Sequence, residues 1–163
     1  MEKSFKMKVE NFFLRYAYPC AYIALQRGEI TNEELQELEE AAVENKDITR
    51  EKLEKVFHKA FESIRELAKE RNKDIWDEAI IREFFYSYHN KVIEKGEGTY
   101  ATAPETLKEL SKVTDAKVVK KNDDNLLVEY DKKIRCVMNS FVAEAKEGDI
   151  VRIHYGYAVE IIE

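Results

Sequence analysis

The spacing of apolar residues changes once along this chain of 163 residues, and that change limits the folds it can adopt. As far as Gly96, apolar residues recur with the period of an amphipathic helix. After Gly98 they form short runs separated by turn-forming residues, as strands do. The sequence therefore predicts an α+β fold. We expect an N-terminal helical bundle in a domain of residues 1–98, and a short helix plus a small β-barrel in a domain of residues 99–163.

The first two helices have clear boundaries. The first is predicted to run through Pro19 with a kink, because the apolar stripe keeps its phase there, and to stop at Gly28. Thr31 and Glu34 have the spacing of a capping box, in which each side chain accepts a hydrogen bond from the other residue's backbone N–H. This box predicts a second helix that ends near Glu44.

Two further helices are expected before the glycines. Thr49 can cap a helix whose apolar stripe continues to Ala68. Asp74 is expected to cap a fourth helix that ends near Gly96. Apolar residues cover more than half of its circumference, so it must be buried on two sides, by the other helices or by a partner.

The second region begins with a short helix predicted at Pro104–Ser111, after which the pattern is that of strands. Five short strands at regular spacing are typical of a small barrel or sandwich. The predicted strands are residues 117–119, 126–130, 134–138, 150–155 and 157–162.

The last 48 residues resemble a known family, the hydrogenase maturation chaperones of the HypC/HupF type. The resemblance is greatest in the segment GDIVRIHYGYAVE, where the matching positions are Gly148, Asp149, Val151, His154, Gly156, Tyr157 and Ala158. The resemblance implies an OB-like barrel that delivers an iron–cyanide–carbonyl unit together with a partner protein. In that family, a cysteine directly after the initiator Met and the histidine of the His-x-Gly motif carry out this delivery.

The sequence departs from the family where the metal would be held. Ser111 occupies the position of the family's cysteine, and a hydroxyl is a far poorer ligand than a thiolate for soft, low-valent iron. Cys20 and Cys136 are predicted to lie in the core, where a thiol stays protonated. We therefore expect no bound metal and no cofactor. Ser111, His154, Tyr155 and Tyr157 remain as a candidate surface for a partner or ligand.

No residue pattern points to catalysis. His58 and Glu62 are one turn apart on a predicted helix, which could be half of a metal site, but the Glu-x-x-His pairs that a di-iron bundle needs do not occur. We interpret His58 as a surface or helix-pairing residue and His89 as a hydrogen-bonded structural residue. The sequence gives no specific reason to propose an enzyme.

Charge is distributed evenly along the chain, whose net charge is −6. Residues 1–98 contain 21 acidic and 17 basic side chains, and residues 99–163 contain 12 and 10, so neither half resembles a nucleic-acid footprint. No apolar run is long enough to span a bilayer, and the N-terminus lacks the pattern of a signal peptide. We therefore expect a cytoplasmic protein.

These observations favour a non-catalytic binding or adaptor protein with a HypC-like barrel, linked to metallocentre or hydrogenase assembly. It would act on a protein partner, and a homo-oligomer is compatible with the sequence. Two alternatives remain open. One is an OB-type protein that binds single-stranded nucleic acid through Tyr130, Tyr155, Tyr157 and neighbouring lysines. The other is a protein that binds a small ligand.

Overall fold

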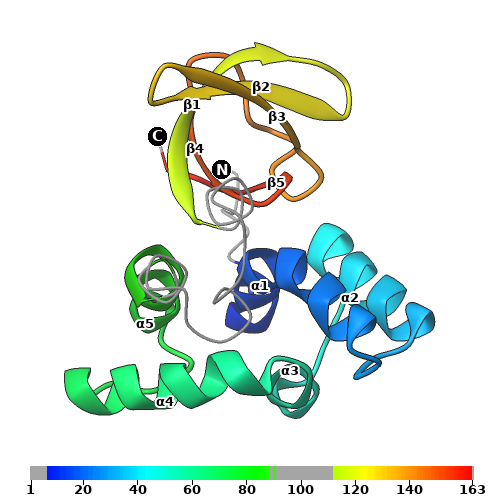
Figure 1. Cartoon of the computed structure of the whole chain (residues 1–163), viewed down its shortest axis with the longest axis vertical. Helices are drawn as coiled ribbons and strands as arrows, with labels where there is room; N and C mark the ends of the chain where they lie inside the picture. The colour runs from blue at the N-terminus through cyan, green and yellow to red at the C-terminus, as the bar shows by residue number, and fades with distance from the viewer. Residues whose placement is uncertain (1–6, 89, 91–111, 163) are drawn as a thin grey trace, which may run out of the picture. The chain divides into compact units, whose positions relative to one another are not determined.

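The computed structural model describes residues 7–88, 90 and 112–162. They form two compact units, Met1–Ile81 and Arg82–Glu163, which are described separately below (Figure 1). The α+β class is confirmed, with helices in the first unit and a closed five-stranded barrel in the second. The predicted boundary at Gly96 and Gly98 and the predicted helix at Pro104–Ser111 lie outside the described residues. No helix in the described ranges is both long and apolar enough to cross a membrane.

The first unit begins with two helices that lie where the sequence predicts them. Helix α1 spans Val9–Gln26 and continues through Pro19, and Gly28 follows it with a φ of +73°. Helix α2 spans Asn32–Glu44 and begins with the predicted capping box, in which the Glu34 backbone N–H donates to Thr31 Oγ1 at 3.1 Å. The two helices pack together because the Asn11 side chain of α1 donates to carbonyls at the C-terminal end of α2 and just beyond it.

The third predicted helix is divided in two. Thr49 caps helix α3 (Arg50–Val56) as expected, but the backbone leaves the helical conformation at Phe57 before helix α4 (His58–Arg71) begins. The Phe57 ring is buried against Phe13, with ring centroids 5.6 Å apart. An apolar stripe therefore continues across two helices instead of one.

The start of the fourth predicted helix is wrong by a few residues. The Asp74 carboxylate accepts from the Trp76 backbone N–H at 2.7 Å, which makes a turn instead of a helix cap. Trp76 then packs on Phe61 in the aromatic core. Helix α5 begins at Glu78, where Asp77 accepts from the Ala79 N–H at 2.8 Å.

Helix α5 (Glu78–Glu83) passes directly into a π-helical turn, η1 (Phe84–Tyr88). The predicted end of this helix near Gly96 lies outside the described residues. A π-helical turn is rare and marks a place where local packing overrides the ordinary helix. In this chain the turn precedes the barrel and belongs to the second unit.

The barrel has the five predicted strands, with boundaries close to those expected. They are β1 (Thr114–Lys121), β2 (Asn125–Tyr130), β3 (Lys133–Met138), β4 (Ile150–His154) and β5 (Tyr157–Ile161). The strand order around the barrel is β1-β2-β3-β5-β4, and β4 pairs back with β1. Pairs are antiparallel except β3 with β5, which meet in parallel at Met138 and Tyr157.

The interior of the barrel is filled by side chains that alternate along each strand. Because successive side chains on a strand point to opposite faces, each core residue fixes the outward direction of its neighbours. The buried cluster is Ala116, Val118, Leu126, Val128, Val137, Val142, Ala145, Val151, Ile153 and Ala158. This register determines which residues the outer face presents.

Candidate functional site: two outer faces of the barrel

The chain's own preceding segment covers the outer face of β4 and β5. Arg82 donates to the carboxylate of Glu160 on β5, with Nη2 to Oε2 at 2.8 Å. Arg152 on β4 lies opposite Glu160 and forms an ion pair with Asp115 of β1 at 2.8 Å. The Arg152 guanidinium also lies over the Tyr86 ring, 4.3 Å from its centroid. Residues from Arg82 to Tyr86 are therefore part of the barrel unit's packing.

His154, which the sequence placed on a candidate partner surface, lies under this same segment. Its side chain is 0% exposed, and its ring centroid is 6.1 Å from that of Phe85 in η1. The Tyr155 ring centroid is 5.0 Å from that of His154. His154 is therefore buried by the chain itself and does not form part of an exposed surface.

Tyr155 and Tyr157 are half-buried and hold the barrel together at the β4–β5 turn. Tyr155 has a φ of +53°, and its carbonyl accepts a hydrogen bond from the Arg135 guanidinium of β3. The Tyr157 ring stacks on Phe141 with centroids 5.0 Å apart and planes 13° apart. Ser111, the fourth candidate residue, lies outside the described residues.

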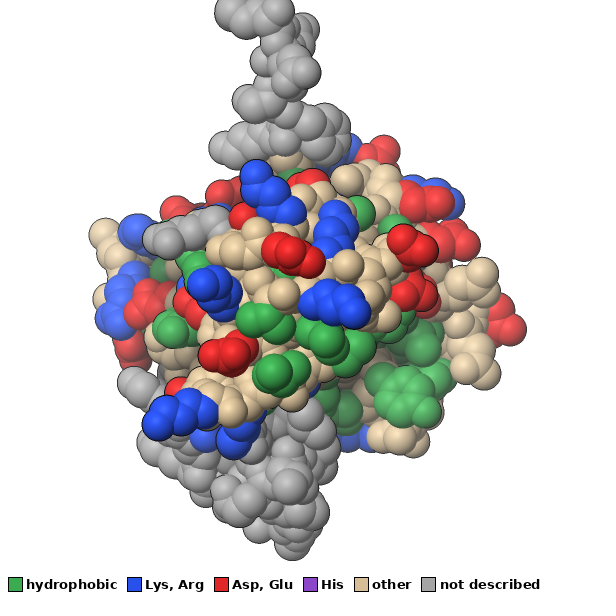
Figure 2. All heavy atoms as spheres, turned by 90° about the horizontal axis from the view of Figure 1, so that it is seen from above, with side chains coloured by type: hydrophobic (Ala, Val, Ile, Leu, Met, Phe, Trp, Pro, Cys, Tyr) green, Lys and Arg blue, Asp and Glu red, His purple; other side chains and the backbone are tan. Residues whose placement is uncertain are grey.

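The outer face of β2 and β3 presents an apolar row. Val137 lies in the barrel core, so Ile134, Cys136 and Met138 point outward along β3. Ile134 is 64% exposed and Met138 is 43% exposed, and Cys136 between them is exposed as well. We call these three residues the β3 strip. Figure 2 shows a face of the chain on which hydrophobic side chains gather between charged side chains of both signs.

The exposure of the β3 strip contradicts the prediction that Cys136 is a core residue. It also contradicts the inference that Ile134 and Met138 are buried beside it. Cys20, in contrast, is partly buried in α1, and burial raises the pKa of its thiol to about 12. The two cysteines therefore differ in accessibility, and only Cys136 presents its thiol at an exposed strand face.

Two lysines border the β3 strip across the sheet. In the register of the strands, Lys117 lies opposite Glu129, which lies opposite Ile134. One step along, Lys120 lies opposite Leu127, which lies opposite Cys136. Lys117 and Lys120 are both exposed, and we call them the β1 lysine row. Within the described residues, neither lysine takes part in an ion pair.

Aromatic side chains are not part of this outer face. Tyr130 packs against the barrel core and makes a 3.4 Å hydrogen bond with Arg135, while Tyr155 and Tyr157 lie at the β4–β5 turn. Proteins that bind single-stranded nucleic acid through an OB-type barrel rely on aromatic rings as stacking platforms. The three tyrosines proposed for that purpose therefore do not form a platform on the β2–β3 face.

The described residues do not gather the side chains that a metal site requires. They contain no cluster of three or more His, Cys, Asp or Glu side chains that could hold a metal ion. His58 is about half exposed and lies 3.5 Å from Glu29, which agrees with its interpretation as a surface-pairing residue. His89 lies outside the described residues.

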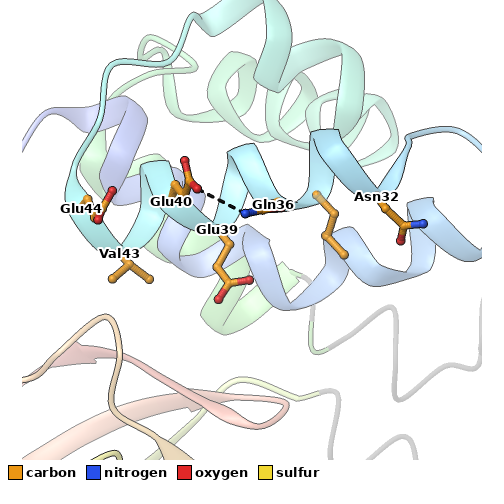
Figure 3. A pocket seen from close by; sticks show the side chains of 7 residues that line it. Asn32, Gln36, Glu39, Glu40, Val43 and Glu44 are labelled. Atoms are coloured by element: carbon orange, nitrogen blue, oxygen red, sulfur yellow. Dashed lines mark hydrogen bonds between the residues drawn. The ribbon is translucent and has the colours of Figure 1, made fainter.

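A shallow groove follows one face of α2 (Figure 3). All of its lining residues come from that one helix: Asn32, Leu35, Gln36, Glu39, Glu40, Val43 and Glu44. Glu39 accepts from the Tyr18 hydroxyl at 3.1 Å, and Glu40 accepts from Lys46 at 3.1 Å. The groove carboxylates are thus engaged in surface contacts and do not converge on one point.

Comparison with known proteins assigns no family to the chain. No protein-family model matches the chain, and no curated protein matches it either.

Proposed function

We propose that this chain is a non-catalytic binding protein, an adaptor that docks a partner protein on the outer face of its barrel. The β3 strip is the observation that carries the proposal, because Ile134, Cys136 and Met138 form a contiguous exposed apolar row, and such rows mark interaction sites. Full burial of an isoleucine or methionine side chain contributes about 1.5–3 kcal/mol, and burying the exposed parts of Ile134 and Met138 would contribute a share of that. Three adjacent side chains can therefore anchor an interface.

The proposal includes a narrower part, which rests on the resemblance to the HypC/HupF-type chaperones. That part assigns the adaptor to metallocentre assembly, with hydrogenase maturation as the specific process. The strand order and the segment from Gly148 to Ala158 support it. The chain's own segment covers His154, so the docking surface in this proposal is the β3 strip instead of the His-x-Gly motif.

An affinity experiment in native lysate tests both parts. A partner that binds the native chain should be lost when Ile134→Asp and Met138→Asp are combined. It should be retained by Val43→Asp, a matched change at an exposed apolar residue of α2. A retained protein of metallocentre assembly supports the narrower part. Equal retention of the partner by the native chain, the double variant and Val43→Asp would contradict docking on the β3 strip.

The nucleic-acid alternative is tested separately with a labelled single-stranded oligonucleotide. Contacts to phosphates make binding strongly dependent on salt concentration. Binding with a steep salt slope that survives the Ile134→Asp and Met138→Asp changes would favour the alternative over the adaptor.

A further inference from the structure

The width of the outer barrel face limits what can cover it. The β3 strip and the β1 lysine row are separated by β2, and strands are about 4.8 Å apart, so the two rows are about 10 Å apart. One extended strand presents a single row of side chains to a face. An α-helix, which is about 10–12 Å across, can present side chains to both rows at once.

The length of the β3 strip is compatible with a short helix. Ile134 and Met138 are four residues apart, which is about 14 Å along a strand. A helix rises about 1.5 Å per residue, so about nine residues cover this length. Two to three helical turns would bring apolar side chains onto all three residues of the strip.

The charge of the face indicates the charge of its occupant. Lys117 and Lys120 are exposed at one border, and Glu129 of β2 lies between them and the strip, whereas the Asp115 carboxylate farther along β1 is paired with Arg152. A second copy of this chain would bring the same two cations to the interface, which like charges oppose. An acidic partner complements them.

We propose that the β3 strip and the β1 lysine row together bind an amphipathic α-helix of a partner protein. Its apolar stripe lies on Ile134, Cys136 and Met138, and acidic residues along one border of that stripe face Lys117 and Lys120. This inference rests on the proposed function, since it specifies the partner for the same face.

Cys136 provides a native handle for the test, because in a buffer that contains a small disulfide and its thiol, Cys136 and a peptide thiol exchange into a mixed disulfide while the small disulfide is reduced to two small thiols. The probes are helical peptides of about 18 residues, long enough to form isolated helices. Each carries a cysteine in the middle of its apolar stripe. One peptide has glutamates at the border of the stripe and one has lysines. A third keeps the glutamates but has serines in the stripe, and a fourth has a central proline that breaks the helix.

The fraction of full-length chain disulfide-bonded to each peptide is measured by intact-mass spectrometry over a range of reductant concentrations. Cys20 is an internal control, because burial raises the pKa of its thiol to about 12 and leaves little thiolate to exchange. The disulfide between Cys136 and the glutamate peptide should withstand about tenfold more reductant than the disulfide with the lysine peptide, because complementary charges favour and select that partner. The serine and proline peptides should be lost at low reductant.

A charge-reversed chain provides the matched comparison. Lys117→Glu with Lys120→Glu should remove or reverse the preference for the glutamate peptide. Lys55→Glu with Lys59→Glu changes the net charge equally at exposed residues of α3 and α4 and should leave the preference intact.

The outcomes separate this inference from the proposed function. Equal trapping of the glutamate and lysine peptides, with loss of the serine peptide, would overturn the acidic helix and leave apolar docking intact. Undiminished trapping of the proline peptide would overturn the helical form of the partner. Equal trapping of all four peptides would overturn both proposals.

Discussion

Asn90 connects the segment before the barrel to the first strand, and its replacement tests how the second unit is held together. Its side-chain Nδ2 donates to the carbonyls of Tyr86 and Val113, both at 2.8 Å. Its Oδ1 accepts from the Val113 backbone N–H, also at 2.8 Å. One side chain therefore satisfies both backbone groups of Val113, a residue that is 1% exposed.

Asn90→Ala should lower the free energy of unfolding of the barrel unit by about 2–4 kcal/mol. A buried backbone donor or acceptor without a partner costs about 1–3 kcal/mol. Two such groups are left at Val113, and water that reaches the site offsets part of the cost. Asn90→Asp keeps the acceptor for the Val113 N–H but places a carboxylate against two carbonyl oxygens, so at pH 7 it should be at least as destabilising.

The measurement is urea unfolding of the full chain, combined with amide hydrogen exchange of β1 to β5. The one tryptophan, Trp76, lies in the first unit, so its fluorescence reports that unit alone. Ser87→Ala is the control, because Ser87 is exposed in the same segment and a surface change of this kind stays within about 0.5 kcal/mol. If Asn90→Ala and Ser87→Ala were equally stable, the reasoning about Val113 would be refuted.

Further predictions concern the two cysteines, Thr31, Pro19 and bound iron. A thiol reagent at pH 8 should label Cys136 rapidly and Cys20 only on unfolding, with the rapid phase lost in Cys136→Ser. Burial raises the pKa of the Cys20 thiol to about 12, so the unfolded chain loses this proton at a lower pH than the folded chain. The free energy of unfolding should therefore fall as pH rises from about 9 to 12, and urea titrations should show a smaller decline in Cys20→Ala. Thr31→Ala should destabilise the first unit by about 1 kcal/mol, measured by Trp76 fluorescence in urea, whereas Pro19→Ala should change its stability by about 1 kcal/mol or less in either direction. Elemental analysis of purified protein should show no stoichiometric iron, and infrared spectroscopy should show no cyanide or carbonyl bands, since soft iron requires converging thiolates. Bands that disappear in Cys136→Ala would contradict this prediction.

Local signals in the sequence predicted much of the fold because they depend on neighbouring residues. The capping box at Thr31 and Glu34, the cap at Thr49 and the turns between strands each act within a few residues. The register of β3 could not be obtained in this way. In Lys-Ile-Arg-Cys-Val-Met, the alternation of charged and apolar residues places Ile134, Cys136 and Met138 toward the core.

The structure reverses that register because pairing with β2 determines it. Val137 lies opposite Leu126 in the core, and Arg135 lies opposite Val128, where its guanidinium reaches the Tyr155 carbonyl. An inward-facing arginine at the end of a barrel has no signature in the strand's own sequence. The signal available was Leu126 and Val128 in the preceding strand, which require an apolar neighbour such as Val137.

The covering of His154 could not be predicted from local sequence either. The contacts between Arg82 and Glu160, and between Tyr86 and Arg152, join residues more than sixty positions apart. The apolar pattern after Asp74 did indicate a helix buried on two sides. It did not indicate that the helix would become a π-helical turn on the barrel, because that depends on the shape of β4 and β5.

The distribution of Trp76 and Cys136 also makes the chain a natural two-probe system. One unit contains the sole indole fluorophore, and the other contains the sole thiol at an exposed strand face among the described residues. An acceptor dye attached to Cys136 would therefore receive energy from Trp76 without any engineered residue. The transfer efficiency would report the separation of the two units in solution, and its change on adding a partner would measure whether docking on the barrel moves the helical unit.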